Sequence, residues 1–188
     1  AKAKELAKEM NYRPNPFAMS LRKNAPRIIG VIVPDIVTHF FASILNGIEN
    51  MAIANGYFVI ITTSHESYEH EKRNVENLVN MRVEGIIACL SQETTDYSHF
   101  AALKDINMPL ILFDRVCLTE QFSSVVADGV QSAQMATQHL LDNGSKRVAF
   151  IGGANHLDIV KKRKHGYLEA LRDNRIPIEK ELVVCRKI

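Results

Sequence analysis

Short apolar runs alternate with amphipathic stretches from residue 28 onward. The run at residues 28–33 is continuous and rich in β-branched side chains, which is typical of a strand buried on both faces. The next stretch has the period of a helix, with Phe41, Ile44, Leu45, Ile48 and Ala52 on one face before Asn55-Gly56 ends it. In the same way we predict strands at residues 57–63, 85–89 and 110–113, with helices at residues 68–81 and 97–106. Such alternation predicts a parallel sheet with helices on both faces and right-handed crossovers.

The rhythm restarts after an irregular stretch that follows residue 115. We expect a strand at 124–127, a helix at 130–142, a strand at 147–151, a glycine-containing loop at 152–155, a helix at 159–173 and a strand at 182–184. We place a boundary between two lobes near Asp128. Two or three strands are few for a doubly wound lobe, so we expect the second lobe to be incomplete here.

The ends of the predicted strands indicate where a ligand would bind. In open parallel sheets, ligands lie outside the carboxyl ends of the strands. This rule selects the loops at residues 34–41, 64–67, 90–93, 114–115 and 152–158. With two lobes, the two sets of loops can face each other across a cleft.

Charge is spread unevenly along a chain whose net charge is only +2. Residues 1–27 carry seven basic and two acidic side chains, whereas the remainder carries 16 basic and 19 acidic ones. A basic arm on a mildly acidic body suggests that the arm meets nucleic acid. On charge alone, a solvated helix with a few lysines fits equally well.

Composition and cysteine usage indicate an ordinary globular protein. Of the 188 residues, 46% are hydrophobic and 23% charged, and no apolar run is long enough to span a bilayer. Cys89, Cys117 and Cys185 are odd in number and lie in or beside apolar runs. We therefore expect reduced, mostly buried thiols in a cytoplasmic protein.

The sequence carries no signature of an enzyme. It has no G-x-G-x-x-G, no phosphate-binding G-x-x-x-x-G-K-[ST], no G-x-S-x-G and no H-E-x-x-H, so we predict no catalytic residue, metal or cofactor. Asp35, Asp114 and Asp128 each follow a predicted strand, which fits sugar-hydroxyl binding and helix capping equally. The basic run at residues 161–165 shares a helix with an apolar face, so we favour a solvated surface there over a nucleic-acid patch.

Several segments together resemble LacI/GalR-type transcriptional regulators. Residues 6–15, LAKEMNYRPN, and 18–22, AMSLR, resemble the end of the helix-turn-helix headpiece and the hinge helix. The opening IGVIVPD at residues 29–35, followed by Phe40-Phe41, is similar to the first strand and cleft loop of the regulatory core. Two later segments, PLILFDR at 109–115 and RKHGY at 163–167, occur in the order that the family has them.

This resemblance implies an α/β fold, a two-lobed periplasmic-binding-protein-like (type I) core with parallel sheets flanked by helices. It divides the chain into a headpiece remnant (1–13), a hinge helix and linker (14–26), an N-terminal core lobe (27–127) and a partial C-terminal lobe (128–188). The implied function is that of a cytoplasmic repressor without membrane contact. Its implied partners are operator DNA, a homodimer mate and a small effector, a sugar or related metabolite.

The resemblance also assigns roles to hinge residues. Leu21 would wedge between base steps in the minor groove, which kinks the DNA. Asn15 and Ala18 would lie close to the groove, and Arg22 would reach a phosphate. The alternative for Leu21 is a linker leucine that packs on the core. Met19 departs from the arginine that is usual at its position, which puts one polar contact near the DNA in doubt.

For the effector, Phe40 and Phe41 would offer flat faces, Asp114 would accept hydrogen bonds from hydroxyls, and Arg163 would donate them. Arg115 would either contact the effector or pin its loop through a salt bridge. Packing aromatics and surface ion pairs are the alternative roles for these residues. Thr38-His39, Leu157 and Ile159 depart from the family pattern and suggest a partly apolar or unusually shaped pocket.

Other functional classes stay open on the sequence. A solute-binding protein of the same fold would need a signal sequence and no basic arm, and an enzyme of the flavodoxin-like or Rossmann type would need a phosphate loop. A regulator controlled by a protein corepressor is a third possibility. The identity of the effector, and whether it releases or recruits DNA, cannot be inferred from the residues.

Overall fold

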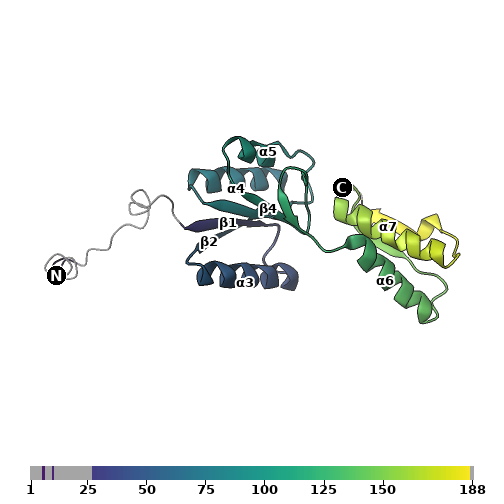
Figure 1. Ribbon diagram of the computed structural model, residues 1–188. Coiled ribbons are helices and arrows are strands. Elements are labelled where there is room, and N and C mark those ends of the chain that lie inside the picture. The colour runs from purple at the N-terminus through teal and green to yellow at the C-terminus, as the bar shows by residue number, and fades with distance from the viewer. Residues whose placement is uncertain (1–5, 7–9, 11–26, 187–188) are drawn as a thin grey trace.

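The first half of the chain forms one parallel sheet in a computed structural model that describes residues 6, 10 and 27–186 (Figure 1). Its strand order is β2-β1-β3-β4-β5, and each neighbouring pair is parallel. The strands are β1 (Ile28–Val33), β2 (Phe58–Thr63), β3 (Gly85–Ala88), β4 (Leu110–Phe113) and β5 (Ser123–Val125). The predicted parallel sheet is therefore confirmed.

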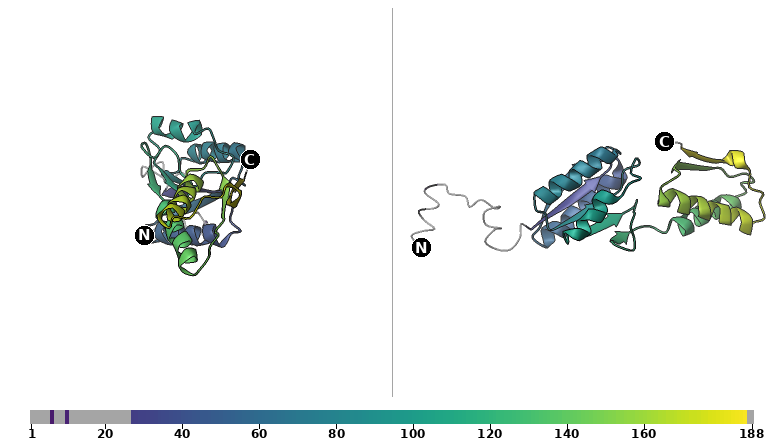
Figure 2. Two further views of the ribbon diagram at one scale, coloured as in Figure 1. Left: turned by 90° about the vertical axis from the view of Figure 1, so that its right-hand side faces the viewer. Right: turned by 90° about the horizontal axis from the view of Figure 1, so that it is seen from above.

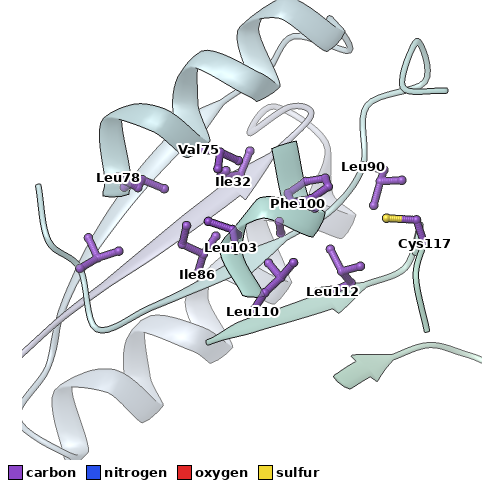
Figure 3. Packing of buried hydrophobic residues seen from close by; sticks show 12 residues of the cluster. Ile32, Val75, Leu78, Ile86, Leu90, Phe100, Leu103, Leu110, Leu112 and Cys117 are labelled. Carbon is purple, nitrogen blue, oxygen red and sulfur yellow. The ribbon is translucent and has the colours of Figure 1, made fainter. Parts of the chain in front are cut away.

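Helices cover both faces of this first sheet. Helix α3 (His39–Ala54) lies on one face, and α4 (Tyr68–Asn80) and α5 (Ser98–Asp105) lie on the other (Figure 1). The sequence of β1 explains why both faces are covered, because Val31 and Val33 enter the cluster with Phe41 of α3 while Ile32 points to the opposite side. On that side a larger core packs between the sheet and the two helices (Figure 3).

The second half forms a smaller sheet in which β6 (Phe150–Ala154) pairs in parallel with β7 (Val183–Arg186). Helices α6 (Gly129–Asp142) and α7 (Asp158–Asp173) lie on the same side of these strands (Figure 2), and a short 3-10 helix, η1 (Lys180–Leu182), precedes β7. The hydroxyl of Tyr167 donates a 2.9 Å hydrogen bond to the carbonyl of Val148, which ties α7 to the segment before β6.

The strand predicted at residues 147–151 is misplaced, because the structure has β6 at Phe150–Ala154. The Gly152-Gly153 pair that suggested a loop belongs to the strand. A Cβ on Gly152 would lie 2.7 Å from the Phe150 ring and 3.1 Å from Val160, so this glycine permits α7 to pack closely. The other predicted strands and helices agree with the structure to within two residues at each end.

The three cysteines are free thiols. Cys89 and Cys117 are buried, and burial raises the pKa of each to about 12. Both thiols therefore stay protonated at neutral pH, which makes them poor nucleophiles. Within residues 27–186, no helix has the length and apolar content needed to cross a membrane.

Candidate functional site

The loops after β1 to β4 leave the first sheet at one edge, because all four strands run in the same direction. This carboxyl edge carries several of the side chains that the sequence singled out. Phe40 opens α3 after the β1 loop, and Asp114 and Arg115 directly follow β4. The edge is therefore the place to look for a ligand site.

The two phenylalanines at the start of α3 have different surroundings. Phe40 is 51% exposed, whereas Phe41 is 6% exposed. The Phe41 ring packs edge-on against Phe113 at 6.4 Å between centroids and also contacts Phe40 at 5.1 Å. The structure thus places Phe41 in the core, where its face is covered, and leaves Phe40 as the aromatic surface at this edge.

Asp114 has an unusual backbone conformation at the end of β4. Its φ of 57° lies in the left-handed region, which aspartate and asparagine tolerate better than most residues. Its backbone N–H donates to the carbonyl of Val125 at 3.1 Å, which ties the turn to β5. Partial burial raises the pKa of Asp114, against the opposing effect of the Arg115 and Arg163 charges.

Arg115 is engaged by the protein itself. Its Nη1 donates to Oε2 of Glu66 at 2.6 Å and to the carbonyl of Leu90 at 3.2 Å, and its side chain is 15% exposed. Burial alone would lower the pKa of Arg115, but the hydrogen bond to Glu66 and nearby negative charges raise it. These contacts match the second of the two expected roles, in which Arg115 pins its loop.

Arg163 lies on helix α7 beside the second sheet and is exposed. Its charge acts to lower the pKa of Asp114, so the guanidinium lies within electrostatic range of that carboxyl. Lys161 and Lys162 beside it are also exposed, and Lys162 pairs with Asp158 at 2.8 Å. Both lysines therefore lie on the solvent-facing side of α7.

A buried acidic residue behind the edge was not anticipated from the sequence. Glu71 of α4 is fully buried and accepts hydrogen bonds from the backbone N–H of Ser91 at 2.6 Å and from Thr94 Oγ1 at 2.7 Å. Its Oε1 also lies 2.9 Å from Nε2 of His99. The polar stretch around Glu71 looks like a solvent-facing helix turn, and only its position four residues before Val75 on the buried face gave a signal.

The other aspartates that follow strands accept hydrogen bonds from nearby backbone N–H groups. Oδ1 of Asp35 accepts from the backbone N–H of Val37 at 2.9 Å, and Oδ1 of Asp128 accepts from that of Gln131 at 3.0 Å at the start of α6. Asp128 therefore caps α6, whereas Asp35 stabilises a turn in the loop before α3. Within the described part of the chain, no group of three or more His, Cys, Asp or Glu side chains is placed to hold a metal ion.

The remaining expected site residues fall into two groups. Leu157 and Ile159 pack with Ala154 and Val160 in a small apolar cluster at the start of α7. The hinge residues Asn15, Ala18, Leu21 and Arg22 lie outside the described residues.

A parallel sheet that gathers polar side chains at its carboxyl edge, followed by a second parallel sheet whose helix brings an arginine towards that edge, has the architecture of a periplasmic-binding-protein-like core. Residues 27–186 match the family described as periplasmic binding proteins and sugar binding domain of LacI family. The chain belongs to this family.

Relatives and solved structures agree with this assignment. The chain is 32% identical to catabolite control protein A of Priestia megaterium, over 97% of the chain and 55% of the relative. It is 28% identical to the ribose operon repressor of Halalkalibacterium halodurans, over 90% and 49% of the respective lengths. The Cra transcriptional dual regulator from Pseudomonas putida, solved in complex with fructose 1-phosphate, superposes with a TM-score of 0.75 at 26% identity, over 85% of this chain and 57% of that one. The chain thus spans about half the length of the relatives that it matches.

Proposed function

We propose that this chain is part of a DNA-binding transcriptional repressor whose core binds a small effector, a sugar or related metabolite, and thereby controls operator binding. The observation that carries the proposal is the carboxyl edge of the first sheet, where Phe40 is exposed beside the partly buried Asp114 and the Arg163 charge acts on the Asp114 carboxyl. The relatives named as repressors, and the related regulator solved with fructose 1-phosphate, support it. On this proposal the protein is a cytoplasmic regulator and has no catalytic activity.

The proposed organisation follows the same family. Residues 1–13 are the end of a DNA-reading headpiece, 14–26 the hinge, 27–127 the first lobe and 128–188 part of the second lobe. The protein acts as a homodimer, and an apolar hollow of about 640 Å³ beside α3, lined by Ile44, Ile48 and Met51 among others, is a surface of the kind that mediates association.

In the effector site, each side chain has a distinct task. Phe40 offers a flat apolar face to a ring, the Asp114 carboxylate accepts hydrogen bonds from hydroxyl groups, and Arg163 donates to a hydroxyl or an anionic group. Phe41 supports Phe40 from the core. Arg115 acts by pinning the loop rather than by direct contact.

The effector acts on DNA through lobe closure. A ligand that engages Asp114 and Arg163 together favours a closed arrangement of the two lobes, because it gains contacts from both only there. Closure changes how the hinges of the dimer are presented, and operator affinity changes by thermodynamic linkage.

Replacing Asp114 by asparagine should weaken effector binding by about tenfold or more, because a hydrogen bond to a charged acceptor is worth about 1.5–3 kcal/mol. The measurement is a thermal-shift screen with ribose, fructose 1-phosphate and other sugars, followed by calorimetry on any compound that stabilises the wild type. Asn tolerates the left-handed backbone at this position, so the fold should persist.

The matched control is Asp105→Asn, at the exposed end of α5, which should leave binding unchanged.

The stability of the Asp114→Asn variant gives a second check. Because burial raises the pKa of Asp114, its ionised form costs stability, and this cost is present above that raised pKa and disappears as pH falls below the ordinary value. The variant should thus be at least as stable as the wild type at pH 7. If the wild type and the Asp114→Asn variant bind the effector equally tightly, Asp114 does not contact the effector.

Replacing Leu21 by alanine in the full-length regulator should lower operator affinity by about tenfold or more, since the truncated side chain cannot fill an opened base step. Operator fragments would be selected from random-sequence DNA by the wild-type protein, and binding measured at fixed salt by anisotropy. Ser20→Ala in the same hinge is the control. Light scattering should show the same oligomeric mass for all three proteins. Unchanged affinity in the Leu21 variant would contradict the wedge.

A further inference from the structure

The loops after β2, β3 and β4 are joined at the carboxyl edge by the side chain of Glu66. Glu66 lies in the first of these loops, and its Oε2 accepts from the backbone N–H of Gln92 at 2.7 Å in the second. The same oxygen accepts from Nη1 of Arg115 at 2.6 Å in the third. One carboxylate therefore contacts two neighbouring loops at once.

Arg115 completes the connection between the second and third loops. Its Nη1 also donates to the carbonyl of Leu90 at 3.2 Å, and the backbone N–H of Leu90 donates back to the carbonyl of Arg115 at 3.3 Å. These contacts fix both the backbone and the side chain of Arg115. The residue before it is Asp114, whose own backbone N–H donates to the carbonyl of Val125, so the backbone is held on both sides of the Asp114 Cα.

The backbone at Glu66 is strained in a way that serves these contacts. Both His65 and Glu66 have left-handed conformations, with φ of 51° and 62°. Such conformations are unfavourable for non-glycine residues, and they persist where the surroundings over-determine them. The two residues turn the chain at the end of β2, and this turn directs the Glu66 carboxylate back toward the other loops.

We propose that Glu66 is a positioning residue for the effector site, which holds Arg115 and thereby keeps the Asp114 carboxylate in its binding position before the effector arrives. The proposal rests on the proposed function, because it takes Asp114 as an effector contact. Preorganisation reduces the ordering that a ligand must impose on a loop when it binds. Loss of Glu66 therefore weakens effector binding although Glu66 itself does not contact the effector.

Glu66 also keeps Arg115 away from Asp114. The Arg115 charge already acts on the neighbouring Asp114 carboxyl. Without the carboxylate of Glu66, the guanidinium would be free to pair with Asp114 and would occupy the acceptor that the effector needs. On this proposal Glu66 both positions the Asp114 carboxylate and leaves it free to accept hydrogen bonds from the effector.

Glu66 differs from its neighbour Glu71 in what it supports. Glu71 is fully buried and accepts from the adjacent amide, Ser91, whereas the Glu66 side chain is 34% exposed. A partly exposed carboxylate is tolerant of replacement, so Glu66 variants should fold. This difference makes binding and stability separable in experiment.

The first test measures amide hydrogen exchange without any ligand, in the wild type and in Glu66→Gln, Glu66→Ala and Glu93→Gln. Glu93 is an exposed residue of the same loop region that accepts from the backbone N–H of Tyr68 at 3.2 Å, so it is the matched control. Exchange in residues 90–94 and 114–118 should rise by about tenfold in the Glu66→Ala variant and less in Glu66→Gln. Unchanged exchange in both Glu66 variants would overturn the proposal.

The second test is a double-mutant cycle with Asp114→Asn, read as affinity for whichever sugar or sugar phosphate stabilises the wild type. Glu66→Ala should weaken binding by about tenfold in the wild type and by less than about twofold in the Asp114→Asn background, because it acts through Asp114. Full additivity of the two losses would contradict the positioning role. If no compound in the panel binds the wild type, the proposed effector function fails, and the exchange measurement alone decides whether Glu66 holds the loops.

Discussion

Replacing Glu71 by alanine should lower the free energy of unfolding by about 3–5 kcal/mol, because each buried polar group left without its partner costs about 1–3 kcal/mol. The substitution leaves the backbone N–H of Ser91, the hydroxyl of Thr94 and Nε2 of His99 without their acceptor in a site that water does not reach. The measurement is urea unfolding followed by circular dichroism, with the midpoint and slope compared.

Two further variants make this prediction specific to the buried contacts. Glu71→Gln keeps one acceptor oxygen and should lose roughly half as much stability. Glu76→Ala, an exposed position on the same helix, should change stability by no more than about 0.5 kcal/mol. A loss for Glu71→Ala as small as that of Glu76→Ala would mean that the network contributes little.

Replacing Gly166 by alanine should destabilise the second sheet's half of the molecule by about 3 kcal/mol, at the upper end of what overpacking usually costs. A Cβ on Gly166 would lie 2.0 Å from the carbonyl oxygen of Val130, and this clash involves backbone on α6 that cannot move aside as a side chain would. Thermal unfolding of the variant should show an earlier transition, with loss of the Tyr167 contact to Val148.

Gly153→Ala provides the same chemical change in the same half of the molecule. Its Cβ would meet only Val160, at 3.6 Å, which is ordinary van der Waals contact. A change of no more than about 1 kcal/mol is expected, since alanine is also better suited than glycine to a strand interior. Similar losses in the two variants would show that the crossing of α6 and α7 is not as close as the structure has it.

A continuous apolar run was sufficient to predict β1 because this strand is covered on both faces. The run at Ile28–Val33 reads as continuous β-branched sequence, and the structure divides it between two clusters on opposite sides of the sheet. The placement of β6 could not be predicted this way, since Gly152 marks close packing of a helix and not a turn. Local propensity treats both cases alike, and only tertiary contacts separate them.

The sequence indicated the candidate residues at the carboxyl edge, but not the carboxylates that hold the loops behind them. Strand ends pointed to Asp114 and Arg115, and the family resemblance pointed to Phe40 and Arg163. The carboxylates behind them were missed, because an acidic residue in a polar stretch gives no sign of burial until its donors are known. Phe41 was assigned to the site although it lies in the core at 6% exposure, because the adjacent Phe40 and Phe41 look equivalent in the sequence.

At the carboxyl edge, the residues that hold the loops together are different from the residues that face solvent, and this separation has an evolutionary consequence. Glu71 satisfies buried donors, and Glu66 and Arg115 join the loops, so neither task is assigned to the exposed side chains at the rim. Phe40 and Arg163 can therefore be exchanged for other residues at little cost to folding. A scaffold arranged in this way can acquire a new ligand preference by drift at its rim while its interior stays under purifying selection.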